Sequence, residues 1–520
     1  MKIKKVLSIL SALCLAFSIS GCGGGKVSEE QVGEFEHKVS DELLELSYFF
    51  HYGTQIYDNE WPVYKKAQEY TNVKLNGVVS KMASDWNVSF NTMISAKPLP
   101  DIIWNSRDKI NQYALIGGFV PLDDLIDKYA PNIKAYLNEN PELRKEMVAS
   151  DDKLYFIPNI TEQRAKEVWY IRQDWLTKLG LQKPKTVEEL YEAAKAIATG
   201  DPNGNGKKDE IPIFGRAGYF QIKKLLNLYG VRMQEMRPFY EDNGEIKFAY
   251  MDDTFKNAVS RIAEWYKEGL IDPELYTRKD ARTYLLSNDL GGITSDFHGS
   301  NDQMNDQFKD VIEGFDFQFL DMPSDINGDV WDGTGGYNGY GFGWGISVNN
   351  KHPEETMKYF DFWFSEDGRR LNTMGVEGLS YNMVNGAPAY TDEYLHGTDT
   401  LPVMMDKIGA GQVIGGVVTF DFNRGFLRPE LFEKTSTITD TVNYLPPFPN
   451  LPLSQEELTE VRNIMNVIYS FTDEKLQKWV LGSEAPEAVY DDYLKQLHTL
   501  GIDRVLEIYN NSYKIYLSNK

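Results

Sequence analysis

The chain has 520 residues, of which 42% are hydrophobic and 25% are charged, so its composition is that of a globular protein long enough for more than one lobe. Its formal net charge of -23, with no basic tract after residue 26, argues against nucleic acid and against broad contact with anionic lipid. Aromatic residues make up 13% of the chain, and a minority of them in a polar cleft would suit the flat apolar faces of a sugar.

The first 22 residues, 1–22, have the pattern of a secretory signal. Lysines at the start precede an apolar run over 6–17, which is too short to span a bilayer. The signal ends in Ile19-Ser20-Gly21-Cys22, which resembles the bacterial lipobox, where the cysteine is acylated and the signal is cut before it. Because each buried methylene contributes about 0.8 kcal/mol, two or more acyl chains hold a protein at a membrane. The alternative is an ordinary cleaved signal that leaves Cys22 as a free thiol.

Lipidation of Cys22 predicts a protein anchored on the extracellular face of the cell membrane, as in a Gram-positive-type envelope. The other cysteine, Cys14, lies in the discarded signal, so the mature chain would have no disulfide and would depend on a large core. Residues 23–42 are glycine-rich and then polar, which predicts a flexible tether between the membrane and the folded part.

Strand and helix patterns alternate after the tether. Leu44, Leu46 and Tyr48 alternate with polar residues as in a strand, a helical stretch follows over 62–70, and a short apolar strand is expected over 100–104. This alternation predicts an α/β fold with parallel-rich mixed sheets flanked by helices. Ligands are then expected at the carboxyl ends of the strands.

A second lobe is predicted to begin near Trp169, where a strand pattern runs straight into a helix. Thr186 and Glu189 have the spacing of a capping box at the start of the next helix. The expected core positions of that helix are Leu190, Ala194 and Ile197.

Glycines alternate with aromatic and aliphatic residues over 339–346, which predicts a strand with one bare face. A bare face lets another backbone or a ligand approach closely, and core packing is the favoured reason. A helix opens after His352, with Met357, Phe360, Phe364 and Leu371 as its expected core positions.

A ten-residue loop, 201–210, has the spacing of a calcium site. An EF-hand-like loop offers side-chain oxygens at positions 1, 3 and 5, glycine at 6, a backbone carbonyl at 7 and a carboxylate at 9. These positions are filled in order by Asp201, Asn203, Asn205, Gly206, Lys207 and Asp209. Pro212 replaces the usual bidentate glutamate, and Glu210 is expected to supply that carboxylate instead. The alternative is a solvated turn, but turns rarely place every donor at this spacing, so a structural calcium ion is predicted.

Motifs of common catalytic chemistry are missing from the sequence. The six histidines have no paired metal-ligand spacing, and there is no nucleophile elbow, phosphate-binding loop or Cys-x-x-Cys pair. Paired carboxylates for glycoside hydrolysis remain open, because 77 acidic residues offer many pairs. We therefore expect no enzyme, with an extracellular carbohydrate-active enzyme as an alternative.

Short motifs that follow one another along nearly the whole chain carry a family resemblance. They are the lipobox, Leu99-Pro100-Asp101-Ile102-Ile103, the segments 170–176 and 179–181, the calcium loop ending at Pro212, the segment 375–378 and the closing run 479–516. Together they resemble the extracellular solute-binding proteins of ABC importers, family 1, especially the large oligosaccharide-binding members near the alginate-binding proteins. The resemblance implies a two-lobed periplasmic-binding-protein-like fold of type II, which captures an oligosaccharide in the cleft between the lobes and delivers it to the ABC permease subunits. A receptor for a peptide or another solute is the alternative.

The resemblance also implies where the lobes divide. Lobe 1 is expected over 43–158 plus 346–400, and lobe 2 over 159–345 plus 401–520. Closure of the lobes around the solute would be a hinge motion, and the permease would recognise the closed form. The protein is expected to be a monomer that contacts the membrane only through its lipid anchor.

Solute contacts are implied by the same resemblance and by residue type. Positions matching the cleft of sugar-binding relatives are Trp104, Asn105, Tyr219, Phe220, Asp296 and His298. Residue type and loop context add Trp61, Trp169, Tyr337, Trp344, Tyr381 and Arg424. Stacked rings would supply affinity, and polar groups would read hydroxyl directions. An acidic solute such as alginate would require clustered Lys or Arg, and candidates such as Arg172 and Arg424 are scattered.

Overall fold

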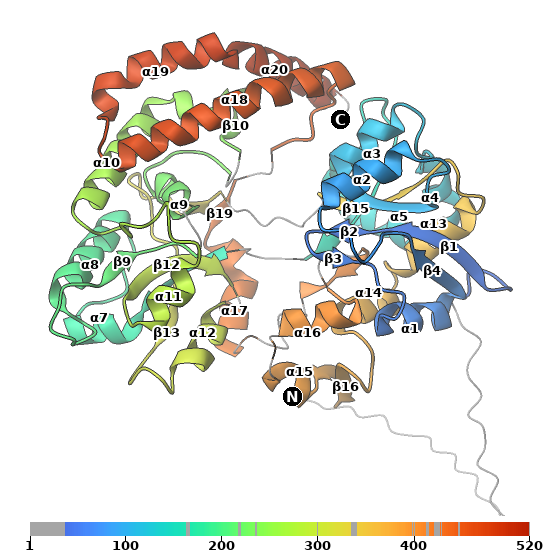
Figure 1. Ribbon diagram of the computed structural model, residues 1–520, viewed down its shortest axis with the longest axis horizontal. Helices are drawn as coiled ribbons and strands as arrows, with labels where there is room; N and C mark the ends of the chain where they lie inside the picture. Colours follow the sequence, from blue (N-terminus) through green and yellow to red (C-terminus); the bar gives the residue numbers. More distant parts are fainter. Residues whose placement is uncertain are drawn as a thin grey trace, which may run out of the picture. The chain divides into compact units, whose positions relative to one another are not determined.

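The computed structural model describes residues 37–518, with gaps at 163–166, 217–219, 235–236, 299, 334–340, 398, 400, 412–414, 421–426, 428 and 446–447. The predicted signal, Cys22 and most of the predicted tether lie outside these residues. The part from His37 onward forms one compact unit (Figure 1). None of the helices that the structure describes has the length and apolar character needed to cross a membrane.

The first lobe is built around a five-stranded sheet. Its strands, in spatial order, are β4 (Val73–Gly77), β1 (Leu44–Phe49), β5 (Ile102–Ser106), β15 (Phe342–Ile346) and β6 (Ile157–Pro158). β1 is parallel to β4 and β5, whereas β15 is antiparallel to β5 and β6. The strands predicted at Leu44 and over 100–104 are therefore confirmed. The late strand β15 enters the sheet between two strands from the start of the chain.

Among the described residues, the helices around the sheet of the first lobe are α1 (Pro62–Thr71), α2 (Trp86–Ser95), α3 (Arg107–Ala114), α4 (Asp123–Tyr129), α5 (Pro131–Glu139), α6 (Pro141–Met147), α13 (Pro353–Phe362) and α14 (Glu366–Met374). α1 begins with proline at its first position, where the missing N–H costs nothing. α2 begins after Asp85, whose carboxylate accepts a hydrogen bond from the Val88 N–H. The core positions predicted after His352, namely Met357, Phe360, Phe364 and Leu371, are all buried.

Further short elements complete this lobe: β2 (His51–Tyr52), β3 (Gln55–Ile56), β16 (Tyr381–Val384), β17 (Ala387–Tyr390), α15 (Asp392–His396) and α16 (Leu401–Ile408). β7 (Ile160–Thr161) pairs in parallel with β18 (Val417–Val418). The first hydrophobic core contains buried residues from 46 to 160 and again from 344 to 418. The predicted boundary assigned 401–418 to the second lobe, whereas the buried residues described in this range pack in the first core, namely Leu401, Met405, Ile408, Ala410, Val417 and Val418.

The second lobe contains a four-stranded sheet in the order β13 (Phe317–Leu320), β8 (Glu167–Arg172), β12 (Gly291–Phe297) and β9 (Ile211–Ile213). β8 is antiparallel to both of its neighbours, and β12 is parallel to β9. The strand predicted at Trp169 is thus confirmed, in a sheet of mixed direction.

The helices that the structure describes around this sheet are α7 (Gln173–Leu179), α8 (Val187–Gly200), α9 (Phe220–Leu228), α10 (Asp253–Lys267), α11 (Ala281–Ser287), α12 (Ser300–Phe308) and α17 (Pro429–Thr437). Smaller elements are the hairpin of β10 (Phe239–Asp242) and β11 (Glu245–Phe248), the pair of β14 (Trp331–Asp332) and β19 (Asn443–Tyr444), and the 3-10 helices η1 (Ala249–Met251) and η3 (Ile438–Asp440). Half of the predicted capping box is confirmed, because the Thr186 hydroxyl accepts a hydrogen bond from the Glu189 N–H at 3.1 Å. The Glu189 carboxylate accepts from the Lys185 N–H at 2.7 Å instead of from the Thr186 N–H. The predicted core positions of α8, Leu190, Ala194 and Ile197, are buried.

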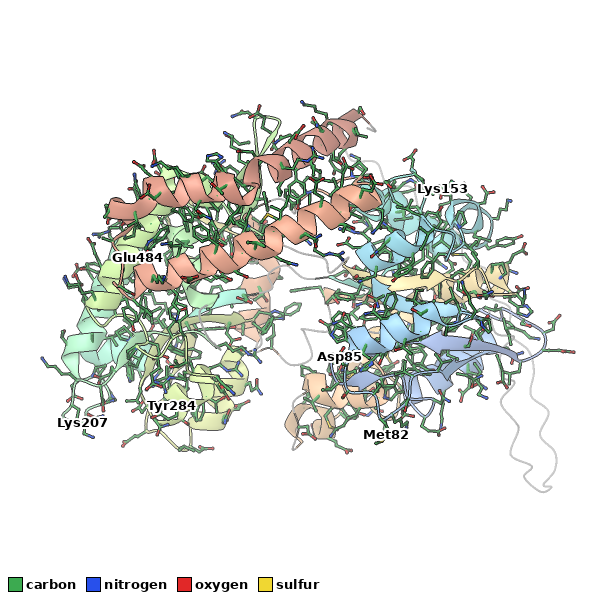
Figure 2. The ribbon with its side chains drawn as sticks, turned by 45° about the horizontal axis from the view of Figure 1, so that its top comes forward. Met82, Asp85, Lys153, Lys207, Tyr284 and Glu484 are labelled. Carbon is green, nitrogen blue, oxygen red and sulfur yellow. The ribbon has the colours of Figure 1, made fainter. Side chains whose placement is uncertain are left out.

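Three helices end the chain: α18 (Gln455–Val480), α19 (Pro486–Leu500) and α20 (Ile502–Ser518). α18 and α19 lie against α10, as both views of the ribbon show (Figures 1 and 2). Trp479 of α18 is fully buried and contacts the Phe255 ring of α10 and the Tyr493 ring of α19. The C-terminal helices therefore complete the core of the second lobe.

The bare face of β15 explains how this strand fits into the first sheet. A Cβ atom built on Gly343 would lie 2.0 Å from the Ile157 carbonyl oxygen, and one built on Gly345 would lie 2.6 Å from the Phe119 ring. The opposite face carries Trp344, which is buried and stacks on Phe360 with centroids 4.6 Å apart. The expectation that core packing explains the alternating glycines is met at these two positions.

We expect Gly343→Ala to destabilise the protein by about 2–3 kcal/mol, because the new methyl group would clash with the Ile157 carbonyl oxygen, which is fixed in the backbone. Gly345→Ala should cost less, since the Phe119 side chain can shift. Urea unfolding of both variants, followed by circular dichroism, measures the difference. Equal midpoints for the two variants, or no loss in Gly343→Ala, would contradict this account of the strand.

Candidate functional site

Aromatic side chains gather at one edge of the first sheet. β1 and β5 are parallel, so their carboxyl ends lie together, and the amino end of the antiparallel β15 reaches the same edge. This topology brings together Tyr52, Trp104 and Phe342, and α2 adds Trp86 at its first turn. Ligands of α/β proteins bind at the carboxyl edge of the strands, so we call these four residues the aromatic platform.

The platform has one buried ring and three half-buried ones. Trp104 is fully buried, and the Phe342 ring stacks on it with centroids 4.9 Å apart and planes 12° apart. Tyr52 meets Trp104 edge-on at 5.5 Å, Trp86 at 5.6 Å and Phe342 at 5.2 Å. The half-buried rings of Tyr52, Trp86 and Phe342 are thus held in place by their neighbours and still offer surface.

The structure shows Trp104 as the floor of the platform, although the sequence pointed to it as a ring for direct stacking. Its indole N–H is buried without a hydrogen-bond partner among the described residues. Asn105 is also buried, and its side-chain oxygen accepts a hydrogen bond from the Ser106 N–H at 2.7 Å. The half-buried rings were missed by sequence reasoning. Phe342 lay in the alternating strand pattern, and Trp86 followed the helix cap Asp85, so both signals were present.

At one edge of the second sheet lies a buried carboxylate that binds two arginines. Asp296, at the end of β12, accepts hydrogen bonds from Arg282 at 2.6 Å and from Arg216 at 3.0 Å. Arg282 also donates to the Ser300 hydroxyl at 3.0 Å. Arg216 lies over the Phe297 ring, with its guanidinium carbon 5.0 Å from the ring centroid. Because Asp296 is buried, Arg216 and Phe297 are the partly exposed groups that this cluster presents.

The same sheet edge carries a second charged pair. Lys224 lies 3.0 Å from the carboxylate of Glu167, which faces Phe297 in the strand register. His298 follows β12 and is buried, and its carbonyl accepts a hydrogen bond from the Tyr170 hydroxyl at 2.6 Å. The predicted residues Asp296 and His298 therefore both lie at this edge, where the Asp296 carboxylate binds two arginines and His298 contributes its backbone carbonyl.

The remaining predicted contacts are spread over both lobes. Trp61 is half-buried and packs edge-on against Tyr57 at 5.4 Å, and Tyr381 is buried in β16. Trp169 is buried in β8, and the indole N–H of buried Trp344 donates to the Tyr48 hydroxyl at 3.2 Å. Phe220 begins α9, and its side chain lies outside the described part. Tyr219, Tyr337 and Arg424 also fall outside the described residues.

Arg172, considered above as a cation for an acidic solute, is fully enclosed. Its guanidinium donates to Asp174 at 2.6 Å and to Asp289 at 2.6 Å. The rings of Trp175 and Phe315 cover it, with centroids 4.5 Å and 4.4 Å from the guanidinium carbon. A buried charge of this kind is compensated inside the protein, so Arg172 has a structural role in the second lobe.

The predicted calcium loop follows α8 directly. Asp201 has a positive φ of 48°, and Gly204 and Gly206 have φ values of 75° and 78°, so the chain curls back on itself. The curl aims backbone N–H groups at the side chains. Gly206 donates to the Asp201 carboxylate at 3.0 Å, and Lys207 donates to the Asn205 side-chain oxygen at 2.8 Å.

Two carboxylate oxygens of the loop, Asp201 Oδ1 and Glu210 Oε2, are buried without a hydrogen-bond partner among the described residues. Burial raises the pKa of the Glu210 carboxyl, and the charges of Asp201 and Asp209 act in the same direction. Lys207 points outward (Figure 2), which leaves its carbonyl to serve as a ligand.

The oxygen donors of the loop fit calcium in chemical type, since calcium binds carboxylate, amide and carbonyl oxygens. Carboxylates alone do not make the site, because the described residues contain no cluster of three or more His, Cys, Asp or Glu side chains placed to hold a metal ion. Asn203, Asn205 and the Lys207 carbonyl would have to complete it.

Comparisons with known proteins agree with this architecture. The profile of the family described as bacterial extracellular solute-binding protein matches residues 55–370. The fructooligosaccharide ABC transporter substrate-binding protein FusA of Streptococcus pneumoniae is 26% identical over 491 residues, which cover 89% of this chain and 88% of FusA. The crystal structure of alginate-binding protein AlgQ2 without calcium ion is 32% identical, with a TM-score of 0.78, and covers 92% of this chain and 100% of that one.

A structure of a FusA EF-hand mutant in complex with fructo-nystose, at 24% identity and a TM-score of 0.71, covers 92% of this chain and 100% of that one and shows the same fold. The predicted two-lobed α/β fold is therefore confirmed. The members of the matching family are binding proteins rather than enzymes. With its profile match over more than half of its length, the chain belongs to the family of bacterial extracellular solute-binding proteins.

Proposed function

We propose that this protein is a lipid-anchored receptor that captures an oligosaccharide outside the cell and delivers it to an ABC importer. The observation that carries the proposal is the aromatic platform at the carboxyl edge of the first sheet. The similarity to FusA and AlgQ2, which bind fructooligosaccharides and alginate by their names, supports the class of solute. The lipobox motif that ends in Cys22 supports the anchor.

Half-buried rings suit a sugar because a pyranose or furanose has apolar C–H faces and a rim of hydroxyl groups. Tyr52, Trp86 and Phe342 already pack against one another or against Trp104, so little side-chain entropy is lost when a sugar stacks on them. The Tyr52 hydroxyl adds a group that can donate or accept a hydrogen bond. The platform would therefore supply affinity without demanding one sugar configuration.

We assign to the cluster around Asp296 the discrimination between solutes by their hydrogen-bonding groups. Arg216 donates to Asp296 and lies over Phe297, so its guanidinium is oriented before any solute arrives. An oriented guanidinium can bind two neighbouring hydroxyls or one carboxylate. The single Asp296 carboxylate pairs with both Arg216 and Arg282, so the cluster has one net positive charge. Neutral and acidic sugars therefore both belong in a binding screen.

Transport by such a receptor needs binding and release and no chemical change in the solute. Differential affinity of a solute for open and closed arrangements of the lobes shifts the population toward the closed one, which the permease subunits would recognise. Residues of the platform and the Asp296 cluster bind and orient in this scheme, and none is assigned a proton transfer. We propose that the protein acts as a monomer.

The solute-binding proposal predicts that Trp86→Ala and Phe342→Ala each weaken oligosaccharide binding by about twofold to tenfold, since one ring contact contributes about 0.5–1.5 kcal/mol. The measurement is isothermal titration with the best ligand from a thermal-shift screen of fructooligosaccharides, alginate oligosaccharides and peptides. Arg216→Ala should change the ranking of neutral and acidic ligands. Met82→Ala serves as control, because Met82 is 91% exposed and lies outside the platform (Figure 2).

Two outcomes would contradict the proposal. Binding of a peptide but of no glycan would assign the protein to another class of solute. Release of smaller sugars during incubation with the best ligand would make it a carbohydrate-active enzyme.

We further propose that calcium occupies the loop 201–210 as a structural ion. Asp201, Asn203, Asn205, Asp209 and Glu210 would bind it through side chains and Lys207 through its carbonyl. The support is the pair of buried oxygens without partners and the spacing of the donors. Among the similar structures, AlgQ2 was solved without calcium ion and FusA as an EF-hand mutant.

Removal of calcium with EDTA should lower the melting temperature at about pH 7, with a loss of about 2.7 kcal/mol relative to calcium at 100 times its dissociation constant. Asp201→Ala should abolish this difference, and Asp242→Ala, which removes a half-buried carboxylate outside the loop, should keep it. The stabilisation by calcium should shrink as the pH falls, because protons compete with calcium for the carboxylates of the loop. In the calcium-free protein the raised pKa of Glu210 favours folding when the group is protonated, a contribution lost as the pH rises, whereas calcium needs the ionised form. An unchanged melting curve after EDTA would contradict the site.

A further inference from the structure

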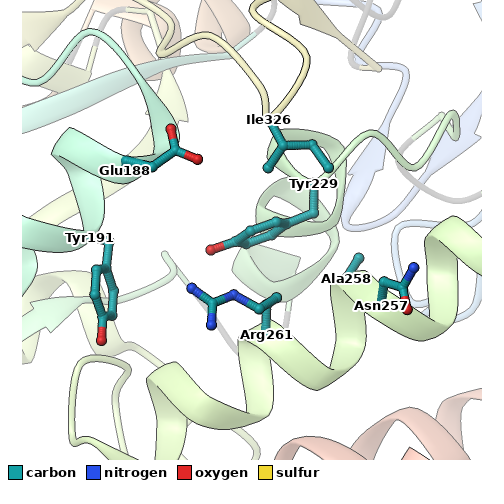
Figure 3. A pocket seen from close by; sticks show the side chains of 7 residues that line it. All are labelled: Glu188, Tyr191, Tyr229, Asn257, Ala258, Arg261 and Ile326. Carbon is teal, nitrogen blue, oxygen red and sulfur yellow. The ribbon is translucent and has the colours of Figure 1, made fainter. Parts of the chain in front are cut away.

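A separate pocket lies on the second lobe, between helices α8 and α10 (Figure 3). It has a volume of about 250 Å³ and shares no residue with the aromatic platform or the Asp296 cluster. Its lining residues are Glu188, Tyr191, Tyr229, Asn257, Ala258, Arg261 and Ile326. Pockets for drug-sized ligands are about 300–1,000 Å³, so this one suits a smaller molecule, such as one sugar ring.

Helical spacing explains how the polar groups converge. Glu188 and Tyr191 are three residues apart on α8, and Asn257 and Arg261 are four residues apart on α10, so each pair shares one face of its helix. Figure 3 shows the Glu188 carboxylate and the Arg261 guanidinium on either side of the Tyr229 hydroxyl. An acceptor, a donor and a hydroxyl therefore face one small volume.

The Arg261 guanidinium donates a hydrogen bond to the Tyr229 hydroxyl, whereas two other polar groups of the rim keep their hydrogen-bonding capacity. Among the described residues, Glu188 and Asn257 form no side-chain hydrogen bond or ion pair, and no ion pair joins Glu188 to Arg261. Arg261 pairs with Glu264 on its own helix, where both side chains are about half exposed. A surface that offers a free carboxylate and a free amide beside a guanidinium can bind a ligand that both donates and accepts.

The apolar part of the pocket is held rigidly. Tyr229 is buried and meets the Trp265 ring edge-on at 6.2 Å, and Ala258 is buried beneath it. The Ile326 N–H donates to the Leu228 carbonyl at 3.2 Å, which fixes the loop that carries the Ile326 side chain. The pocket therefore combines a fixed apolar wall with a polar rim before any ligand binds.

We propose that this pocket is a second carbohydrate site, which binds a single neutral pyranose ring, either free or at the end of a glycan. The apolar wall matches the C–H face of the ring. The hydroxyl groups of the sugar can donate to the Glu188 carboxylate and accept from Arg261. With Asn257 and the Tyr229 hydroxyl, a sugar hydroxyl can act either as donor or as acceptor. A purely anionic ligand would meet Glu188, and a purely cationic one would meet Arg261, so a neutral polyol satisfies the whole rim.

The test uses saturation-transfer NMR on the chain from residue 23 onward, with methyl β-D-glucopyranoside, methyl α-D-mannopyranoside and methyl β-D-galactopyranoside as probes. At least one probe should receive saturation from the protein. Arg261→Ala should weaken its binding about tenfold, the size expected for a hydrogen bond from a charged donor. Asn257→Trp should block the pocket and remove the signal.

The design includes a matched control and decisive outcomes. Glu192→Gln changes an exposed carboxylate one residue beyond Tyr191 on α8, and it should leave binding unchanged. Asn257 and Arg261 are exposed, so both variants are expected to keep the melting temperature of the parent protein. Absence of transfer to all three glycosides would overturn the proposal. So would a signal that is undiminished in both Arg261→Ala and Asn257→Trp.

Discussion

The structure depends on the close backbone contact that β15 makes inside the first sheet. This strand lies between β5 and β6, although more than 180 residues separate it from either along the chain. It fits there because Gly343 presents no side chain to the Ile157 carbonyl. The contact returns the chain from the second lobe to the first. It also places Phe342, at the start of the strand, on top of Trp104, so the aromatic platform exists only if β15 is in this register.

Charge is handled differently in the two sheets. The first sheet has aromatic rings at its edge, whereas the second lobe has ionised side chains that are buried together with oppositely charged partners. Arg172 is fully buried between two aspartates and two rings, and Asp296 is buried beneath two arginines. Removing one member of such a group would leave an uncompensated charge, which typically costs about 3–5 kcal/mol. The rigidity of these groups is what allows Arg216 to be held in one orientation at the surface.

Sequence patterns were a good guide to local structure and a weaker guide to the site. The strands at Leu44 and Trp169 and the cap at Thr186 depend on nearby residues, so periodicity and spacing were enough to find them. Exposure of a ring depends on distant strands. Trp104 was expected to contact the solute because it matches a cleft position of sugar-binding relatives, but β15 covers it with Phe342, and nothing near Trp104 in the sequence reveals that. The pocket between α8 and α10 likewise joins residues about 70 positions apart.

The position of the last three helices has a consequence for how the chain matures. Trp479 and Tyr493 complete a core whose other members include Phe255 and Trp265, so the second lobe cannot close its interior until residues 455–518 have been made. Contacts this far apart in sequence form late. A chain that is threaded through a membrane must stay unfolded while it passes. Late closure of this core would keep the polypeptide loose enough for export and let folding finish on the far side.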